Sequence, residues 1–427
     1  MATNLGIAGL GVVAQGFLDL ASDSQEELES IVGHAVCLKR VASRRPRSEA
    51  DLTHIAFSTD LNDLASDNEL DLVIELIGGT DAAYDLIKRC LQSGRGVITA
   101  NKAVLAEHGN ELLALARTNQ VPLGFEAAVA GGIPIIAPLK TGFPANGIRW
   151  ITGIINGTCN YILTAMARDE TPFDDALRTA QELGYAEADP TFDIGGMDAA
   201  QKLAILVALA YDVPISVDDV YCEGITDLTI DDLKHAEELG YTIKHLAIGR
   251  VVDDSIDMRV HPALIPVNNL IAKVDDVENA VQCGTENAGV LRFMGPGAGG
   301  HATASSVMAD VVNIASGLYR QPSIGGRKLA IKPIDSIEGS FYLGISAADK
   351  PGVIASIGET MARHDISIAS MIQKKEESDG AADDAHIPVV ILTNAIVERE
   401  LNQALVELES LEDIAAPIKK IRVVDFE

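Results

Sequence analysis

The chain has 427 residues, of which 33 are Lys or Arg and 62 are Asp or Glu, so its formal net charge is −29 at pH 7. Hydrophobic residues make up 47% of the chain, which excludes a disordered polypeptide and predicts sizeable buried cores. The acidic excess argues against a protein that binds nucleic acid or anionic membranes, because both need basic surfaces. A chain of this length is expected to form roughly two to four domains.

The cysteine pattern indicates reduced thiols rather than a disulfide framework. The five cysteines are dispersed, without a C-x-x-C pair or a histidine at metal-ligand spacing: Cys37, Cys90, Cys159, Cys222 and Cys283. The first six residues lack the basic and apolar regions of a signal peptide. The longest apolar run, residues 203–211, is half the length that crosses a bilayer. We therefore expect a cytoplasmic protein.

Short apolar runs alternate with helical patterns over residues 1–130. The apolar runs, which we predict as strands, are residues 5–10, 36–42, 72–77, 96–99 and 123–126. The helical patterns, with apolar residues three or four positions apart, are residues 15–20, 81–93 and 109–118. This alternation predicts βαβ units and a parallel sheet with helices on both faces.

A glycine motif, GLGVVA at residues 9–14, follows the first predicted strand. It fits the G-x-G-x-x-G/A pattern, in which the first glycine permits a tight turn and the second lets the backbone approach a pyrophosphate. The following helix would offer free N–H groups to the phosphates. We predict a Rossmann-type dinucleotide site; the alternative is a tight turn without a ligand.

Two arginines follow the second predicted strand, where the adenosine ribose would lie. NAD sites commonly place a carboxylate there to bind the 2′-hydroxyl, but this chain has Ser43, Arg44 and Arg45. Guanidinium groups suit the 2′-phosphate of NADP. The pattern favours NADP over NAD, unless both arginines are ordinary surface charges.

A lysine follows the strand predicted at residues 96–99. In open α/β sheets the ligand crevice lies beyond the carboxyl ends of the strands, so Lys102 would face it. Lys102 would lie beside the nicotinamide, free to contact substrate or ribose. A solvated lysine at a helix start is the alternative.

Residues 180–202, AQELGYAEADPTFDIGGMDAAQK, concentrate five carboxylates around a proline and paired glycines. Asp198 and Lys202 are four residues apart at the start of an apolar helix, so they share one face. A lysine at the mouth of a buried helix can exchange a proton with a substrate hydroxyl. An ordinary surface ion pair is the alternative.

Three further loops contain small or polar residues. Residues 125–134, FEAAVAGGIP, could hold a hard cation with Glu126 and backbone carbonyls, although such loops are usually plain turns. Residues 293–301, FMGPGAGGH, precede a helical pattern and could approach a cofactor closely. Residues 156–158, NGT, are interpreted as a loop, and Cys159 as a small buried residue.

The rest of the chain divides into two parts of different character. Residues 131–297 mix long helices with short strand-like segments such as residues 245–251 and 269–274, an α+β pattern. From residue 339 we predict strands at 341–346, 367–374, 386–392 and 418–424, and helices at 353–364 and 397–408. This βαββαβ order is the ferredoxin-like arrangement. Residues 319–335 are the predicted linker, and the acidic residues 376–384 a solvated hairpin connection.

Taken together, these segments resemble the homoserine dehydrogenases. The resemblance rests on seven segments: GLGVVA at 9–14, ELIGGT at 75–80, TANKAVLAEHG at 99–109, FEAAVAGGIPII at 125–136, GIINGTCNYIL at 153–163, LGYAEADPTFDIGGMDAAQK at 183–202 and GPGAGGHATASSV at 295–307. Residues 341–345 and 349–353 are similar to the start of an ACT domain, which long bacterial members carry after the catalytic part. Ala14 in place of the third glycine is a tolerated departure.

The resemblance implies an NAD(P)-dependent reversible reduction of L-aspartate 4-semialdehyde to L-homoserine. It implies Lys202, Lys102 and Asp198 as catalytic residues, with Lys202 exchanging the proton at the alcohol oxygen. The implied substrate residues are Gly184, Glu187, Asp193 and Asp198. The implied cofactor residues are Gly9, Gly11, Val12, Val13, Arg44, Gly78, Thr99, Lys102, Gly297 and Gly299. A sodium-type cation would be held by Glu126 and the carbonyls of Val129, Gly131 and Ile133.

The predicted architecture has three domains. Residues 1–130, with about 298–330, would form the Rossmann-type domain, residues 131–297 the α+β substrate and dimerisation domain, and residues 338–427 the ferredoxin-like (ACT) domain. We expect a homodimer or homotetramer, with feedback by L-threonine near residues 349–353. Two alternatives are another amino-acid or aldehyde dehydrogenase and a catalytically silent amino-acid sensor.

Overall fold

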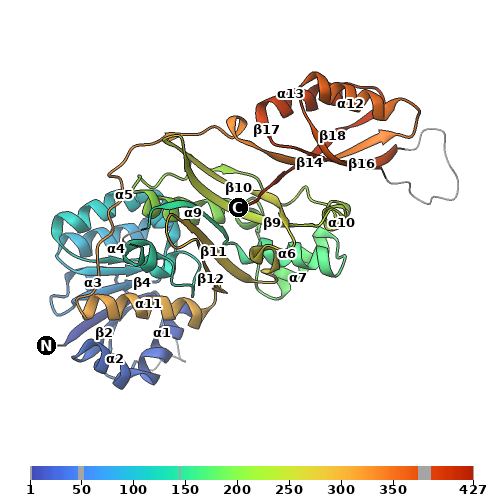
Figure 1. The fold of residues 1–427 in the computed structure, drawn as a ribbon. Coiled ribbons are helices and arrows are strands. Elements are labelled where there is room, and N and C mark those ends of the chain that lie inside the picture. The colour runs from blue at the N-terminus through green and yellow to red at the C-terminus, as the bar shows by residue number, and fades with distance from the viewer. Residues whose placement is uncertain (1, 47–51, 144–145, 374–385, 427) are drawn as a thin grey trace.

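Three lobes lie in a row along the molecule. The computed structural model describes residues 2–46, 52–143, 146–373 and 386–426. Figure 1 shows the N-terminal lobe in blue, the central lobe in green and yellow, and the C-terminal lobe in red at the far end. The chain does not run through them strictly in order, because helix α11 (Gly300–Ala315), drawn in orange, returns to the N-terminal lobe and packs on α1 (Val12–Asp23).

The N-terminal lobe contains the predicted parallel sheet. Its six strands lie in the order β3-β2-β1-β4-β5-β6, and every neighbouring pair is parallel. The strands are β1 (Thr3–Ala8), β2 (Val36–Ala42), β3 (Ala56–Ser58), β4 (Leu72–Glu75), β5 (Gly96–Thr99) and β6 (Leu123–Gly124). The order turns back at β1 and β4, which places a ligand crevice at their carboxyl ends. The Rossmann-type fold class is confirmed.

Helices cover both faces of this sheet and create two apolar cores. The remaining helices of this lobe are α2 (Gln25–Val32), α3 (Asn62–Ser66), α4 (Asp81–Gln92) and α5 (Lys102–Asn119). One core contains side chains of α4 and α5, and the other contains those of α1 and α11. Glycines allow α1 and α11 to touch, because a Cβ added to Gly16 would lie 2.8 Å from the backbone of Gly300.

The central lobe combines an antiparallel sheet with helices, some of them largely buried and others mostly exposed. Its strands run in the order β12-β11-β7-β9-β10. They are β7 (Ile148–Ile154), β9 (Tyr241–Val252), β10 (Ser255–Pro266), β11 (Glu278–Thr285) and β12 (Val290–Pro296), with short β8 (Tyr221–Cys222) beside β10. The helices are α6 (Gly157–Arg168), α7 (Phe173–Glu182), α8 (Thr191–Ile194), α9 (Met197–Tyr211) and α10 (Ile230–Glu238). Buried α9 contacts β9, β10 and β7.

One predicted strand of the central lobe is wrong. Residues 269–274 contain a 3-10 turn, Leu270–Lys273, rather than a strand. The Asn269 side chain accepts a hydrogen bond from the Ile271 backbone N–H at 3.3 Å, and this cap starts the turn. Two other short helical turns, Glu126–Ala128 and Pro138–Gly142, lie in the segment that follows β6.

The C-terminal lobe has the predicted ferredoxin-like order. Its elements are β14 (Glu338–Ala348), α12 (Val353–Arg363), β15 (Ile368–Gln373), β16 (His386–Thr393), β17 (Ile396–Val397), α13 (Glu398–Glu409) and β18 (Ile414–Val423). The strands lie in the order β18-β14-β16-β15. The linker region contains a turn at Ile334–Ser336 and strand β13 (Ala330–Ile331), which pairs with β10. The acidic residues 376–384 lie outside the described residues.

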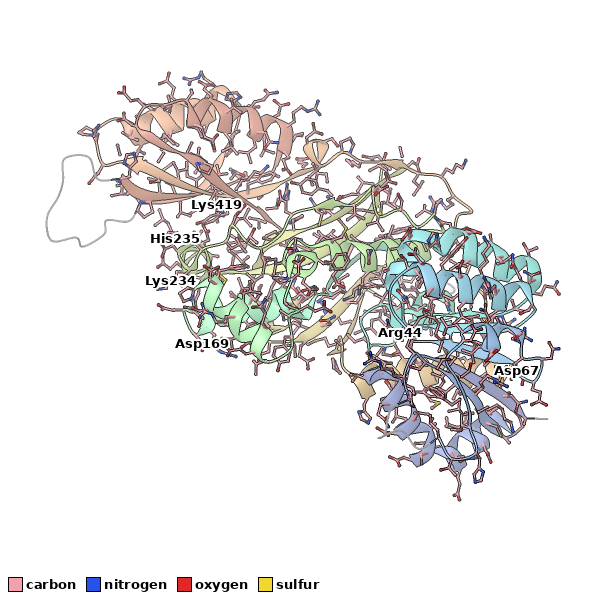
Figure 2. All side chains as sticks on the ribbon, turned by 180° about the vertical axis from the view of Figure 1, so that it is seen from behind. Arg44, Asp67, Asp169, Lys234, His235 and Lys419 are labelled. Carbon is pink, nitrogen blue, oxygen red and sulfur yellow. The ribbon has the colours of Figure 1, made fainter. Side chains whose placement is uncertain are left out.

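The central and C-terminal lobes share a single sheet. Strand β18 pairs in parallel with β10, at Ala263 with Arg422 and at Leu264 with Val423. Side chains also cross the seam: the Tyr342 hydroxyl lies 3.4 Å from His235 Nδ1 of α10. Figure 2 labels His235 on the central lobe and Lys419 on the facing edge of the C-terminal lobe.

None of the helices in the described part of the chain combines the length and apolar character that a membrane span requires.

Candidate active site

A cavity of about 630 Å³ lies between the N-terminal and central lobes. Its wall comes from α5 and the Glu126–Ala128 turn on one side, and from α6, α9 and the residue 296–299 loop on the other. The structure brings nine predicted site residues to this cavity: Lys102, Gly131, Gly184, Glu187, Asp193, Asp198, Lys202, Gly297 and Gly299. Segments separated by up to about two hundred positions therefore meet at one place.

Two lysines flank one buried aspartate in this cavity. Lys202 Nζ donates to Asp198 Oδ2 at 2.7 Å and to the Ile155 carbonyl at 2.7 Å. Lys102 Nζ lies 3.3 Å from the other oxygen, Asp198 Oδ1. The Asp198 side chain is 7% exposed, Lys202 13% and Lys102 32%. Asp198 and Lys202 therefore do not form the ordinary surface ion pair that the sequence left open as an alternative.

The start of α9 explains why this carboxylate stays charged. Gly196 has φ +90° and directs the chain into α9, so Asp198 lies in the first turn, where the helix dipole favours a negative charge. Burial alone would raise the pKa of Asp198, but the charges of Lys202 and Lys102 outweigh it, and the net pKa is lower than usual.

Asn156 joins the two aspartates of the site. Its Nδ2 donates to Asp193 Oδ1 and to Asp198 Oδ2, both at 2.8 Å, while its Oδ1 accepts from the Cys159 N–H at 2.7 Å and caps α6. The sequence interpretation treated residues 156–158 as a plain loop and missed this residue. An Asn before Gly at the end of a strand is a helix-cap signal that could have found it.

Asp193 has a different electrostatic environment from Asp198. Burial raises the pKa of Asp193, and the nearby Asp198 charge adds to that effect. The Asn156 hydrogen bond and the two lysines oppose it, without cancelling it. One carboxyl in the cavity is thus held ionised while the other can change its charge at higher pH than an ordinary aspartate.

A second cavity, of about 870 Å³, lies at the carboxyl ends of β1, β2 and β4. Four of the predicted cofactor residues line it: Gly9, Gly11, Arg44 and Gly78. Arg45 and Ser43 line it as well, and no acidic side chain does so among the residues that the structure describes. Figure 2 shows Arg44 in the N-terminal lobe.

The glycine loop fits a pyrophosphate. Gly9 has φ +96°, and a Cβ there would lie 2.6 Å from the Leu76 carbonyl oxygen, so only glycine suits the turn. A Cβ on Gly11 would meet no protein atom within 4 Å, which leaves its backbone open to the cavity. Helix α1 begins without a side-chain cap, so its first N–H groups remain available to an anion.

The glycines of the 297–300 loop permit close contact with the neighbouring segments. A Cβ on Gly297 would lie 2.0 Å from Asn279 Nδ2, and one on Gly131 would lie 2.4 Å from the Gly297 carbonyl oxygen. A Cβ on Gly300 would lie 2.7 Å from Val12 Cγ1 at the start of α1. This loop therefore runs from the first cavity, which residues 297–299 line, to the start of α1.

Three predicted cofactor residues line neither of these cavities: Thr99, Val12 and Val13. Thr99 is fully buried, and its hydroxyl donates to Glu75 Oε2 at 2.5 Å. Burial raises the pKa of Glu75. Val13 packs against the core shared by α1 and α11, whereas the adjacent Val12 side chain is 67% exposed.

The residues predicted to bind a cation are buried, and hydrogen bonds already occupy several of their oxygen atoms. Each Glu126 carboxylate oxygen accepts a backbone N–H at 2.7 Å, from Ile136 and Ala137, and the Gly131 carbonyl accepts the Ser306 hydroxyl at 2.7 Å. Burial, with the nearby Asp310 charge, raises the pKa of Glu126 to about 7. Among the described residues, no group of three or more His, Cys, Asp and Glu side chains is arranged to hold a metal.

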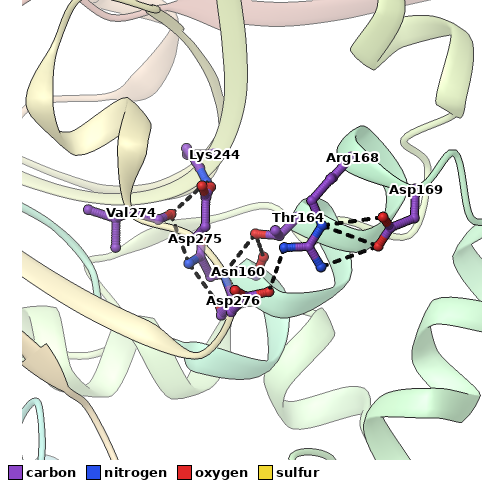
Figure 3. Close-up of polar contacts among 8 residues, drawn as sticks. All are labelled: Asn160, Thr164, Arg168, Asp169, Lys244, Val274, Asp275 and Asp276. Atoms are coloured by element: carbon purple, nitrogen blue, oxygen red, sulfur yellow. Dashed lines mark hydrogen bonds and ion pairs between the residues drawn. The ribbon is translucent and has the colours of Figure 1, made fainter.

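A polar network holds α6 against the segment that leads into β11 (Figure 3). Asn160 Nδ2 donates to the carbonyls of Val274 and Asp276, both at 3.0 Å. The buried Lys244 donates to the Val274 carbonyl at 2.6 Å and to Asp275 Oδ1 at 2.9 Å. The network fixes the helix that Asn156 caps, and therefore the position of Asn156 itself.

Comparison with known proteins matches this chain to one family. Family profiles match as "Homoserine dehydrogenase, NAD binding domain" over residues 9–126, "Homoserine dehydrogenase" over 134–312 and "ACT domain" over 341–410. Homoserine dehydrogenases of Pseudomonas aeruginosa and Bacillus subtilis are 42% and 34% identical to the chain, covering 98% and 96% of both partners.

Solved structures give the same result. A homoserine dehydrogenase from Thiobacillus denitrificans matches with a TM-score of 0.93 and 39% identity, covering 100% of this chain and 99% of that one. A hyperthermophilic archaeal homoserine dehydrogenase in complex with NADPH matches with a TM-score of 0.64 and 26% identity, covering 75% of this chain and 100% of that one.

Proposed function

The chain belongs to the homoserine dehydrogenase family, and on this premise we propose the roles of its site residues. The family reaction is the reversible, NAD(P)-dependent conversion of L-aspartate 4-semialdehyde to L-homoserine. The nicotinamide, when bound, supplies or accepts the hydride. The chain itself must bind the amino acid, orient the aldehyde and move one proton.

We assign the proton transfer to Lys202. The observation that carries this assignment is the Lys202 ammonium in the cavity wall, fixed by Asp198 and the Ile155 carbonyl. A positioned ammonium can stabilise the developing alkoxide and then protonate it. Lys102, on the other side of Asp198, contacts substrate or cofactor ribose.

Carboxylates of the same cavity bind the substrate. Asp193 and the exposed Glu187 supply negative charge for the ammonium group, which a neutral pocket would reject. Gly184, with φ +75°, leaves space beside them. A substrate panel tests this assignment: NADP-linked oxidation of homoserine, without oxidation of aspartate or threonine, supports it, and comparable rates on all three contradict it.

We propose NADP as the preferred cofactor. The support is the cavity wall formed by Arg44 and Arg45, and a structural relative whose complex contains NADPH. Guanidinium groups bind a 2′-phosphate by charge-assisted hydrogen bonds. Changing Arg44 and Arg45 to Gln is expected to raise KM for NADP and leave KM for NAD unchanged. Equal changes in both values would contradict the preference.

We propose that the C-terminal ACT domain mediates feedback by an amino acid, with L-threonine as the effector. ACT domains are consistent with such control, and the predicted position is near residues 349–353. Homoserine oxidation by the full chain, measured with millimolar threonine and then with methionine or lysine, tests the effector. Inhibition by threonine alone supports the proposal, and activity unaffected by threonine contradicts it.

The cation, domain and assembly predictions also remain proposals. The Glu126 carboxylate and the carbonyls of Val129, Gly131 and Ile133 are oxygen donors that suit a sodium-type ion. Replacing Na⁺ with N-methylglucamine should lower activity if that ion is required.

Sedimentation equilibrium would decide between monomer, dimer and tetramer, and limited proteolysis would test the domain boundaries near residues 130, 298 and 338.

A further inference from the structure

We propose that Arg422, in the C-terminal lobe, is a positioning residue for the reaction: it acts through Glu223 to hold the segment that carries Asp193. The inference rests on the proposed substrate-binding role of Asp193. It adds a physical connection between the C-terminal lobe and the active site, which the family assignment does not supply.

The connection begins in a buried ion cluster at the seam of the two lobes. Arg422, on β18, is 3% exposed, and Glu398, at the start of α13, is 2% exposed. Arg422 donates to both Glu398 oxygens, at 2.9 and 2.6 Å, and across the seam to Glu223 Oε2 at 2.7 Å. Lys420 completes the charge balance with a 2.6 Å bond to Glu398. Of these four charged residues, Glu223 belongs to the central lobe, and Tyr221 of the same lobe also accepts a hydrogen bond from Arg422 Nη2 at 3.3 Å.

Hydrogen bonds to β9 and β10 of the central lobe hold the backbone around Glu223. Its N–H donates to the Val260 carbonyl of β10 at 2.8 Å, and its carbonyl lies 2.9 Å from His245 Nε2 of β9. The His245 side chain is 4% exposed. Glu223 therefore joins Arg422 to a backbone segment, residues 222–225, that β9 and β10 also hold.

That segment lies directly against the loop of Asp193. The Ile225 N–H donates to the Ile194 carbonyl at 2.9 Å, and Cys222 Sγ donates to the Gly195 carbonyl at 3.3 Å. Gly224 permits the contact, because a Cβ there would lie 2.4 Å from the Ile194 carbonyl oxygen. The residue next to Ile194 is Asp193, which is bonded to Asn156 and through it to Asp198.

Space for movement lies beside this segment. A cavity of about 380 Å³ is lined by Glu223, Gly224, Leu228, Pro262, Ile418 and Lys420, so residues of both lobes face it. The segment therefore packs against the Asp193 loop on one side and borders this cavity on the other. A loss of the Arg422 contact would let residues 222–225 shift toward the seam and draw the Asp193 loop with them.

The test is Glu223→Gln in the full chain, which removes the charge and keeps the shape. We expect KM for homoserine to rise about 3-fold to 30-fold, while KM for NADP changes less than 2-fold, because the cofactor cavity lies elsewhere. The matched control is Arg363→Met, which removes an ion pair with Glu407 between α12 and α13 of the same lobe. Melting curves establish that each variant is folded.

A second variant alters the contact of residue 224 with Ile194 and leaves the charged residues of the cluster unchanged. Gly224→Ala places a methyl group against the Ile194 carbonyl and should raise KM for homoserine selectively. Arg422→Lys, which keeps the charge, should retain more of the wild-type KM than Arg422→Met. If Glu223→Gln does not raise KM for homoserine above the Arg363→Met control, the proposal is wrong, even where Gly224→Ala raises it.

One comparison separates this proposal from the substrate assignment. If Asp193→Asn leaves KM for homoserine unchanged, the proposed role of Asp193 fails, whatever the seam variants do. If Asp193→Asn raises KM and the seam variants do not, only the connection through Glu223 fails.

Discussion

Lys202 and Asp198 form an ion pair at i,i+4 spacing, an arrangement that is common on helix surfaces and contributes little there. Here the pair lies at the entrance of a buried helix, and a second lysine and an amide share the carboxylate. Asp198 therefore accepts from Lys202 and Asn156 and lies beside Lys102. Its proposed function is to orient the ammonium of Lys202 toward the cavity.

Replacing Lys202 with Met should lower kcat by about 10²–10⁴-fold, the range of a general acid. The aliphatic stem is kept, and Asp198 retains Lys102 and Asn156, so the fold should persist. Steady-state kinetics with homoserine and NADP provide the measurement. Lys234→Met, which breaks a surface pair with Glu170, is the control, and equal activity of the two variants would refute the assignment.

Asp193 should set the acid limb of kcat/KM for homoserine. Burial raises its pKa, so as pH falls it takes up a proton at higher pH than an ordinary aspartate. The neutral acid no longer attracts the substrate ammonium, and kcat/KM should decline. Asp193→Asn should lower kcat/KM at neutral pH and remove this limb from the pH profile. A limb that persists in the variant must belong to another group.

Among single residues, the sequence predicted the charged side chains of the site better than the side chains that hold them in place. Lys202 and Asp198 could be predicted because i,i+4 spacing on a helix determines which residues share a face. Asn156 could not be linked to Asp193 and Asp198, because 37 and 42 positions separate them and only the packing of α6 on α8, and of α8 on α9, brings them together.

At the level of elements, buried parallel strands were the most predictable. The bounds of β5 agree with the predicted run, since a strand covered on both faces is a continuous apolar segment. The 3-10 turn Leu270–Lys273 was mistaken for a strand because a one-turn helix is too short to show a helical period. Its signal was the capping residue Asn269.

The two glycines of the turn before α1 have different roles, one in stability and one in cofactor binding, so their substitutions should have different effects. Gly9→Ala should lower the free energy of unfolding by about 1–3 kcal/mol, because alanine is strained at φ +96° and meets the Leu76 carbonyl. Gly11→Ala should leave the melting temperature unchanged and weaken cofactor binding, because its methyl group enters the open cavity. Thermal melts and NADPH fluorescence titrations measure both, and equal melting temperatures for the two variants would contradict this expectation.

Across the whole molecule, the shared sheet and the Arg422 cluster join the central and C-terminal lobes. Neither could be predicted from the sequence, because residues 223 and 422 are nearly two hundred positions apart and no local pattern pairs them. The ferredoxin-like order was predictable, since each of its elements has its own periodicity.

The seam should weaken in acid. Burial alone would raise the pKa of Glu398, but Arg422 and Lys420 outweigh it, so the net pKa is below its usual value. Its contribution to stability is then fully present above pH about 4.5 and is lost as pH falls through the lower value of the folded state. Glu398→Gln should reduce the melting temperature at pH 7, and the difference from wild type should shrink below pH 4.5. A difference that is constant with pH would contradict this.

The parallel pairing of β10 with β18 has a practical consequence for anyone who wishes to remove the proposed amino-acid control from this enzyme. Cutting the chain before residue 338 would bare the edge of β10 at residues 263–264 and expose Leu264, which shares a core with Tyr342 and Ile421. Open strand edges with apolar neighbours promote aggregation. Desensitised variants should therefore be sought by point substitution in an intact chain, because truncation would damage the scaffold of the catalytic half.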